Sequence, residues 1–199
     1  MSLPADYFEA LYHDSEDPWG FRHRWYEKRK RELTLAMLPR QRYRYIFEPG
    51  CANGELSLGL AQRGERLLCS DASATAVALA RQRLHQQPHV ELVTGRVPAD
   101  WPPQQFDLIV LSELGYYLDE VDLLRLIRRC QDSLSADGAL LACHWLHPIF
   151  DCPLDGRQVH QLLNRHLPLH RQIHHEDADF LLELWCHAPC ATDLEEATL

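Results

Sequence analysis

The residues with the clearest chemical meaning lie in one turn, IFEPGCANGEL at residues 46–56. The pattern predicts an apolar strand that ends on the carboxylate of Glu48. The chain then passes three small residues before a helix begins, namely Gly50, Ala52 and Gly54. Small residues let a backbone approach a ligand closely, and a helix N-terminus offers free N–H groups and a positive dipole end. The turn therefore predicts a ligand-binding site at the end of a strand.

A second acidic residue, Asp71, ends the next predicted strand, seventeen residues after Gly54. A carboxylate at the tip of that strand suits the two hydroxyls of a ribose, which it can bind bidentately. Together, the turn and Asp71 indicate a ligand that contains adenosine. In the alternative interpretation, Glu48 and Asp71 only cap strand ends in an α/β protein that binds nothing.

The spacing of the small residues distinguishes between two adenosine ligands. A nicotinamide dinucleotide site has the pattern GxGxxG, whereas this turn has the pattern ExGxAxG. The carboxylate of Glu48 would repel a pyrophosphate, but it suits a cationic amino acid group. The pattern therefore favours S-adenosylmethionine over NAD, and an NAD-linked reductase is the disfavoured alternative.

The elements that must position these residues alternate between strand and helix. Strands are expected at residues 44–48, 66–70, 90–93, 106–112 and 139–145, and helices at about 55–63, 73–85, 120–134 and 157–167. Such alternation gives a mostly parallel sheet that is covered on both faces. Two further strands at residues 169–175 and 179–186, joined by an acidic turn, predict an antiparallel hairpin at the sheet edge.

A helix is also expected before the first strand, over about residues 21–38, where Trp25, Arg29 and Leu33 recur at helical spacing. The basic run RHRWYEKRKR inside it is either a solvated helix face or a grip on an anionic group. We expect residues 1–40 to be a helical cap of the same domain, residues 41–187 to be the ligand-binding domain, and residues 188–199 to be a polar tail.

Composition excludes several other classes of protein. The chain has 199 residues, close to the size of one domain, with 46% hydrophobic residues and a net charge of -9. The acidic charge argues against nucleic acid as a partner, and no apolar run is long enough to span a membrane. Seven scattered cysteines without a CxxC pair predict buried free thiols, and the histidines lack metal-ligand spacing. We therefore expect a cytoplasmic protein with no metal site.

At this point the chain resembles the class I S-adenosylmethionine-dependent methyltransferases, over about residues 17–186. EPGCANG resembles the first motif of that family, LLCSD the acidic second motif, FDLIVLSELGYYL the fourth-strand motif, and LSADGALL the turn before the fifth strand. More narrowly, DPWGFRHRWYEKRKRELTLAMLP and LSELGYYL are similar to the nodulation protein S (NodS) group and to methyltransferases that accompany PIG-L-type deacetylases. The resemblance implies a Rossmann-like seven-stranded sheet. It also implies methylation of the free amine of a deacetylated chitooligosaccharide, and so an amino sugar as acceptor.

The resemblance also implies a set of cofactor contacts around the carboxyl ends of the strands. The methionine part would lie on the turn, the ribose on Asp71, and the adenine against the residues after the second and third strands. The full implied set is Trp19, Tyr26, Glu48, Gly50, Ala52, Gly54, Asp71, Ala72, Arg96, Val97 and Ser112. Many members of the family have an acidic residue where this chain has Arg96, and that residue contacts the adenine amine. This chain departs from the family pattern at that position.

Methyl transfer to an amine requires a neutral, aligned acceptor and a group that takes its proton. Glu113 follows the fourth strand and is the first candidate for orienting or deprotonating the amine, and His144, at the end of the fifth strand, is the second. The acceptor site is expected to include Tyr116, Tyr117, His147 and His160. In the alternative interpretation Glu113 forms an ion pair with a helix and the histidines are hydrogen-bonded structural groups.

The leading hypothesis is thus a methyltransferase that acts on a small molecule, with the amine of an amino sugar as the first substrate class. An O-methyltransferase of a small metabolite and a non-catalytic module that binds S-adenosylmethionine are the alternatives. A polar cluster at the methyl end of the pocket favours the enzyme, whereas an apolar mouth would favour the module. No pattern in the chain indicates an oligomeric state.

Overall fold

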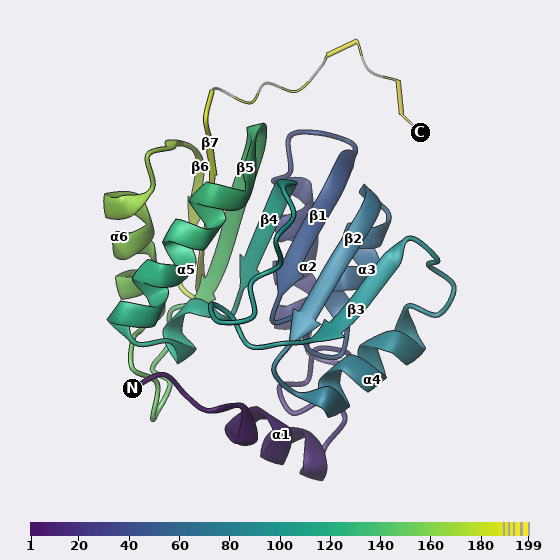
Figure 1. The fold of residues 1–199 in the computed structure, drawn as a ribbon, viewed down its shortest axis with the longest axis vertical. Coiled ribbons are helices and arrows are strands. Elements are labelled where there is room, and N and C mark those ends of the chain that lie inside the picture. The colour runs from purple at the N-terminus through teal and green to yellow at the C-terminus, as the bar shows by residue number, and fades with distance from the viewer. Residues whose placement is uncertain (189, 191, 193, 196, 199) are drawn as a thin grey trace.

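Seven strands form one sheet in the order β3-β2-β1-β4-β5-β7-β6 in the computed structural model, which describes residues 1–188, 190, 192, 194–195 and 197–198 (Figure 1). The strands are β1 (Tyr43–Pro49), β2 (Gly64–Asp71), β3 (Val90–Thr94), β4 (Phe106–Ser112), β5 (Leu134–Trp145), β6 (His170–Glu176) and β7 (Phe180–Cys186). β1 to β5 run parallel, and β7 is antiparallel to both β5 and β6. The predicted fold class, with its antiparallel edge hairpin, is confirmed.

Both faces of the sheet are buried over its central strands, as the apolar character of those strands requires, whereas the edge strands β3 and β6 are largely exposed. In β4, Leu108 and Val110 face the side of the sheet that packs against α3 (Glu55–Ala61) and α4 (Ala74–Arg83). Their neighbours Ile109 and Leu111 face the opposite side, where α5 (Glu120–Ser133) and α6 (Gly156–His166) cover the sheet. The alternation of side chains along a strand therefore produces two cores that share one sheet.

Side-chain caps fix where these helices begin. Ser73 accepts a hydrogen bond from the N–H of Ala76 at the start of α4, and Asp119 accepts one from the N–H of Asp122 at the start of α5. Asp155 and Gln158 form a capping box at the start of α6. These caps satisfy N–H groups that have no partner within the helix, and the caps and first turns lie near the carboxyl ends of the strands.

The N-terminal segment differs from the expectation. A helix that the pattern analysis did not find, α1 (Ala5–Asp14), crosses the end of the sheet where the parallel strands terminate (Figure 1). The second helix, α2, spans Trp25–Ala36 rather than starting at Phe21. It starts late because the Asp17 carboxylate accepts hydrogen bonds from the N–H groups of Phe21 and Arg22, which closes a separate turn.

The buried face of α2 also differs from the expected one. Trp25 is 68% exposed, whereas the buried residues of the helix are Glu27, Lys30 and Thr34. These polar positions are spaced three and four residues apart, so they share one face of the helix. The helix therefore turns charged groups toward the interior of the protein.

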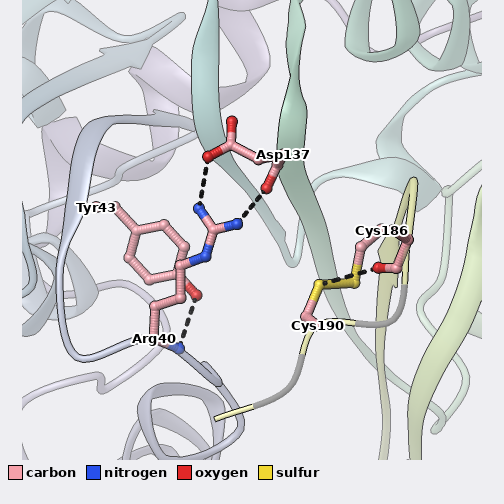
Figure 2. The surroundings of a disulfide bond; sticks show 6 residues. Arg40, Tyr43, Asp137, Cys186 and Cys190 are labelled. Atoms are coloured by element: carbon pink, nitrogen blue, oxygen red, sulfur yellow. Dashed lines mark hydrogen bonds and ion pairs between the residues drawn. A yellow bond between two sulfur atoms is a disulfide. The ribbon is translucent and has the colours of Figure 1, made fainter. Parts of the chain in front are cut away.

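One pair of cysteines departs from the expectation of free thiols. Cys186 at the end of β7 forms a disulfide with Cys190, close to Tyr43 and to an ion pair between Arg40 and Asp137 (Figure 2). The other five cysteines are free, and four of them are buried. Residues 189, 191, 193, 196 and 199 of the expected polar tail lie outside the described residues. Within the part of the chain that the structure describes, no helix is long and apolar enough to cross a membrane.

Candidate active site

A pocket lies at the carboxyl ends of β1, β2 and β4, between the sheet and the N-terminal segment. β1 is flanked by β2 on one side and by β4 on the other, so the chain reverses its direction of winding at this point. Open α/β sheets bind ligands at such a point, because the flanking loops diverge and leave a crevice. Of the predicted site residues, the pocket is lined by Trp19, Tyr26, Glu48, Gly50, Ala52, Asp71, Ala72, Arg96, Val97, Ser112, Glu113, Tyr116 and Tyr117.

The turn after β1 has the backbone conformation that its small residues suggest. Gly50 and Gly54 have φ angles of 75° and 81°, and Ala52 has a φ of 52°. A side chain on Gly54 would lie 3.2 Å from Ala80 of α4, so this glycine allows close packing of the turn on the helix. Gly54 is not among the residues that line the pocket, and its predicted contact with the cofactor stays a prediction.

Asp71 is held at the tip of β2 by backbone donors. Its carboxylate accepts hydrogen bonds of 2.9 Å from the N–H groups of Ala52 and Ser73. Burial raises the pKa of this carboxyl group, and the backbone hydrogen bonds oppose that rise. A carboxylate fixed in this way presents its remaining lone pairs to the pocket, where the hydroxyls of a ribose would be recognised.

Glu48 is almost fully buried at the end of β1, with the thiol of Cys69 3.5 Å from its carboxylate. Burial raises the pKa of Glu48 to about 7, because the charged form loses its hydration. A ligand ammonium in the pocket would restore the charged form. The structure therefore fits a cationic amino acid group, the type of group expected from the sequence pattern.

The N-terminal segment covers the pocket at the carboxyl ends of the strands. The carboxylate of Glu9 in α1 accepts hydrogen bonds from the hydroxyls of Ser73 and Thr75, at the start of α4. The ring of Tyr12 packs against Trp19 at a centroid distance of 5.7 Å, and both side chains line the pocket. The Tyr12 hydroxyl is buried and has no hydrogen-bond partner among the described residues. A buried hydroxyl without a partner is costly, so this group is suited to a polar ligand.

A cluster of charged groups lies at another part of the pocket wall, and only one of its members, Glu113, was predicted as a site residue. Glu113, with a φ of 56°, follows β4, and its carboxylate accepts a hydrogen bond of 2.7 Å from the ammonium of Lys30. Glu27 lies on the other side of the same ammonium, 3.0 Å away. Although burial lowers the pKa of Lys30, the carboxylates of Glu113 and Glu27 raise it, so the ammonium stays charged.

Glu27 and Lys30 were not predicted as site residues, because they belong to the basic run of α2, which resembles a solvated helix face. Their spacing of three residues, continued by Thr34, was the available signal. The sequence alternative in which Glu113 forms an ion pair with a helix matches the observed contact. Tyr116 adds a hydroxyl that donates to Glu113, so an intact polar cluster stands at this end of the pocket.

His144 does not line the pocket, which corrects its assignment as the second candidate base. β5 continues to Trp145 and pairs with β7, so His144 lies inside the sheet and is fully buried. Its Nε2 accepts a hydrogen bond of 3.0 Å from the N–H of Gly115, and its Nδ1 lies 3.0 Å from Nε2 of His160. Burial lowers the pKa of His144, so the ring is neutral. Both ring nitrogens are engaged, and neither is available to an acceptor.

The same chain of hydrogen bonds explains His160, which the structure also places outside the pocket. Because Gly115 donates to His144, the proton of His144 is on Nδ1 and is donated to His160. His160 in turn donates from Nδ1 to Glu183, at 2.6 Å. The two histidines thus position the 115–117 turn. His147 lies on the surface, 47% exposed, and pairs with Asp179 rather than lining the site.

Arg96 has two polar contacts that fix its place at the edge of the pocket. Its N–H donates to Asp100, and its guanidinium donates to the carbonyl of Leu3 in the N-terminal segment. Within the described residues, no group of three His, Cys, Asp or Glu side chains is arranged to hold a metal ion. The pocket as a whole combines buried carboxylates with aromatic side chains, an arrangement that suits a cationic ligand.

The chain is similar in sequence to known methyltransferases and to nodulation proteins. A family profile described as a methyltransferase domain matches residues 46–138. Nodulation protein S from Sinorhizobium fredii (strain NBRC 101917 / NGR234) is 32% identical over 112 residues, which are 56% of this chain and 52% of that relative. Nodulation protein S from Bradyrhizobium diazoefficiens is 32% identical over 128 residues, 63% of this chain and 61% of the relative. The chain thus spans about half to three fifths of these curated relatives.

Two solved structures are similar over most of the chain. A candidate methyltransferase from Pseudomonas syringae is 57% identical, with a TM-score of 0.74, and the match covers 81% of this chain and 99% of that one. The N-methyltransferase NodS from Bradyrhizobium japonicum WM9, solved with S-adenosyl-L-homocysteine, has a TM-score of 0.77 at 22% identity. That match covers 89% of this chain and 96% of the NodS chain. The second likeness is one of fold.

Proposed function

The chain belongs to the class I S-adenosylmethionine-dependent methyltransferases, and on that basis we propose that it transfers a methyl group from S-adenosylmethionine to a small-molecule acceptor. The observation that carries the proposal is the pocket at the ends of β1, β2 and β4, with Glu48, Asp71 and the turn between them on its wall. When bound, S-adenosylmethionine supplies a methyl group on a positively charged sulfur. The protein contributes alignment, charge and exclusion of water.

The residues of the pocket fit this cofactor by the chemistry of their donors and acceptors. Asp71 would hold the ribose hydroxyls, and the buried Tyr12 hydroxyl offers a further polar contact near them. Glu48 would meet the cationic amino acid group, and Ala72, Arg96 and Val97 would border the adenine. Trp19 and Tyr26 would cover the cofactor from the N-terminal segment.

The acceptor class is the finer part of the proposal. An amine, with the amine of an amino sugar first, is supported by the similarity to nodulation protein S and by the acidic character of the cluster at the far end of the pocket. O-methylation of a small metabolite is the competing outcome. The reaction is proposed for the cytoplasm, where the sequence pattern placed the protein.

Calorimetric titration with S-adenosyl-L-homocysteine tests the cofactor assignment. The wild type is expected to bind it in the micromolar range, and Asp71→Ala is expected to weaken binding at least tenfold, because the ribose loses a bidentate partner. Asp132→Ala, an exposed aspartate on α5, is the matched control and should leave affinity unchanged. Absence of binding in the wild type, or equal affinity in Asp71→Ala, would contradict the assignment.

A further inference from the structure

Three charged side chains meet at the acceptor end of the pocket and are almost removed from water. Lys30 is 5% exposed, Glu27 is 9% exposed and Glu113 is 15% exposed. The ammonium of Lys30 lies 3.0 Å from Glu27 and 2.7 Å from Glu113. All three line the pocket, so the cluster faces any molecule that enters it.

The two carboxylates differ in how many hydrogen bonds they receive. Glu113 accepts from the Lys30 ammonium, the Tyr116 hydroxyl and the N–H of Trp145. Glu27 accepts only from Lys30 among the contacts of the described residues. A carboxylate has about four acceptor positions, so Glu27, whose side chain lines the pocket, has more unused acceptor positions than Glu113.

The charges of the cluster do not balance. One ammonium contacts two carboxylates. Arg31 also acts on Glu27 electrostatically, but its guanidinium donates to the carbonyl of Phe21 and lies 4.0 Å from Glu55, which also pairs with Arg83 and Arg22. A buried site with an excess of negative charge is costly unless another cation joins it. The hydroxyl of Tyr26, buried and without a partner among the described residues, lies on the same wall and adds an acceptor for an N–H group.

Resting on the proposed methyltransferase activity toward an amine, we propose that Glu27 binds the acceptor as an ammonium and takes its proton. Lys30 holds Glu113 in place and keeps it from that role, so Glu113 is a positioning residue. The acceptor class that this subsite recognises is a primary or secondary amine that is charged in solution. A neutral hydroxyl would leave the excess charge uncompensated, and a carboxylate would be repelled.

The step balances in atoms and charge. An N–H bond of the acceptor ammonium breaks, its proton moves to a carboxylate oxygen of Glu27, and the electron pair stays on nitrogen. The neutral nitrogen then forms a bond to the methyl carbon, while the bond from that carbon to sulfur breaks and its electron pair stays on sulfur. The product is a methylated ammonium together with S-adenosylhomocysteine, and the proton on Glu27 returns to water.

The environment of Glu27 agrees with this role. Burial raises the pKa of Glu27, and the ammonium of Lys30 opposes that rise. The other charged groups that act on it are Glu113, which raises its pKa, and Arg31, which lowers it. A base works best when its pKa approaches the working pH, because it is then both ionised and able to hold a proton.

The test uses Glu27→Gln with glucosamine as acceptor probe and release of S-adenosylhomocysteine as readout. We expect kcat/KM to fall by about 10²- to 10⁴-fold, the usual contribution of a positioned base. The affinities for both S-adenosylmethionine and S-adenosylhomocysteine should stay within about twofold. Glu32→Gln, on an exposed position of the same helix paired with Lys28, is the matched control and should keep wild-type turnover.

A pH profile separates proton transfer from a purely structural effect. The rate of Glu27→Gln should rise about tenfold per pH unit until the amine itself loses its proton, whereas the wild-type rate should level off at lower pH. Glu27→Asp, which keeps the carboxylate, should retain the wild-type shape of the profile. A thermal melt of each variant confirms that the compared proteins are folded.

The outcomes that overturn the inference are distinct from failure of the proposed function. If the wild type methylates glucosamine and Glu27→Gln keeps its rate, or loses rate equally at every pH, Glu27 is not the proton acceptor. If Glu27→Gln weakens S-adenosylmethionine but not S-adenosylhomocysteine, the carboxylate serves the sulfonium instead. If the wild type binds S-adenosylhomocysteine but methylates only hydroxyl acceptors, the proposed amine specificity fails, and this inference with it.

Discussion

At the scale of single residues, the pocket is organised by buried carboxylates that stand in different environments. Glu48 has no cation beside it among the contacts of the described residues, whereas Glu113 has Lys30 and two further donors. Burial without a partner favours the protonated form, and a cationic partner favours the charged form. A cationic ligand near Glu48 would therefore shift that carboxyl group toward its charged form, whereas Glu113 is already paired with a cation.

Glu48 makes a prediction about proton uptake and release. Its raised pKa of about 7 means that the folded protein without ligand holds this proton more tightly than the unfolded chain does. The stabilisation is complete below about pH 4.5 and is lost as the pH rises through 7. A bound ammonium favours the charged carboxylate, so binding of S-adenosyl-L-homocysteine at pH 6 should release close to one proton.

Calorimetry in two buffers with different heats of ionisation measures this number directly. Glu48→Gln should abolish the release, while Glu65→Gln, an exposed position on β2, should preserve it. Proton uptake on binding, or release that persists in Glu48→Gln, would show that Glu48 does not meet the cationic group.

At the scale of elements, the acceptor end of the pocket is held by a hydrogen-bonded chain that runs from the edge hairpin to the turn after β4. Glu183 of β7 binds His160 of α6, His160 binds His144 of β5, and His144 receives the N–H of Gly115. A side chain on Gly115 would lie 2.9 Å from Nε2 of His144, so the turn and the strand are in close contact. Four elements thus fix the position of Glu113 and Tyr116.

Glu183 should be the most sensitive member of this chain. Burial raises the pKa of Glu183, but hydrogen bonds from His160, His174 and Arg171 outweigh that effect and lower the pKa to about 2. Glu183→Gln should cost about 1.5–3 kcal/mol of stability at pH 7, the usual value for hydrogen bonds to a charged group. The lowered pKa makes this contribution complete above about pH 4.5, and it declines as the pH falls toward 2.

Urea unfolding at pH 7 and at pH 3 checks both the size and the pH dependence of this effect. The difference between wild type and Glu183→Gln should shrink at the lower pH. Glu176→Gln, in the same hairpin with a side chain that is 36% exposed, should change stability by less than about 1 kcal/mol. Equal destabilisation at both pH values would argue against an ionised Glu183 in the folded state.

At the scale of the whole molecule, residues far apart in sequence build one site. The sheet supplies Glu48, Asp71 and Glu113 at strand ends, and the N-terminal segment supplies Tyr12 and Lys30 from above. Lys30 and Glu113 are 83 positions apart, yet they share one partly buried hydrogen bond. The proposed contacts of Glu48 and Asp71 with the cofactor thus come from strand ends, whereas the proposed acceptor contacts depend on how α2 packs against the sheet.

This division explains how much of the site the sequence could predict. The strands themselves, the turn at Gly50 and the carboxylate of Asp71 follow local patterns, because strand and turn signals depend on adjacent residues. The inward face of α2 could not be found in this way, since the partner of Lys30 across the pocket, Glu113, is distant in the sequence. The strand that carries His144 was predicted to its observed end, but the local pattern could not show that its side chain is engaged by Gly115 and His160 instead of lining the pocket.

The most direct test of the proposed methyl transfer to an amine is to follow the methyl group itself. The protein would be incubated with S-adenosylmethionine carrying a deuterated methyl group, and with glucosamine or a glucosamine oligomer, and the products examined by mass spectrometry. The proposed reaction places a deuterated methyl group on the amine nitrogen, formed in step with S-adenosylhomocysteine. Unlabelled sugar together with bound but unconsumed S-adenosylmethionine would contradict it, as would label on a hydroxyl oxygen.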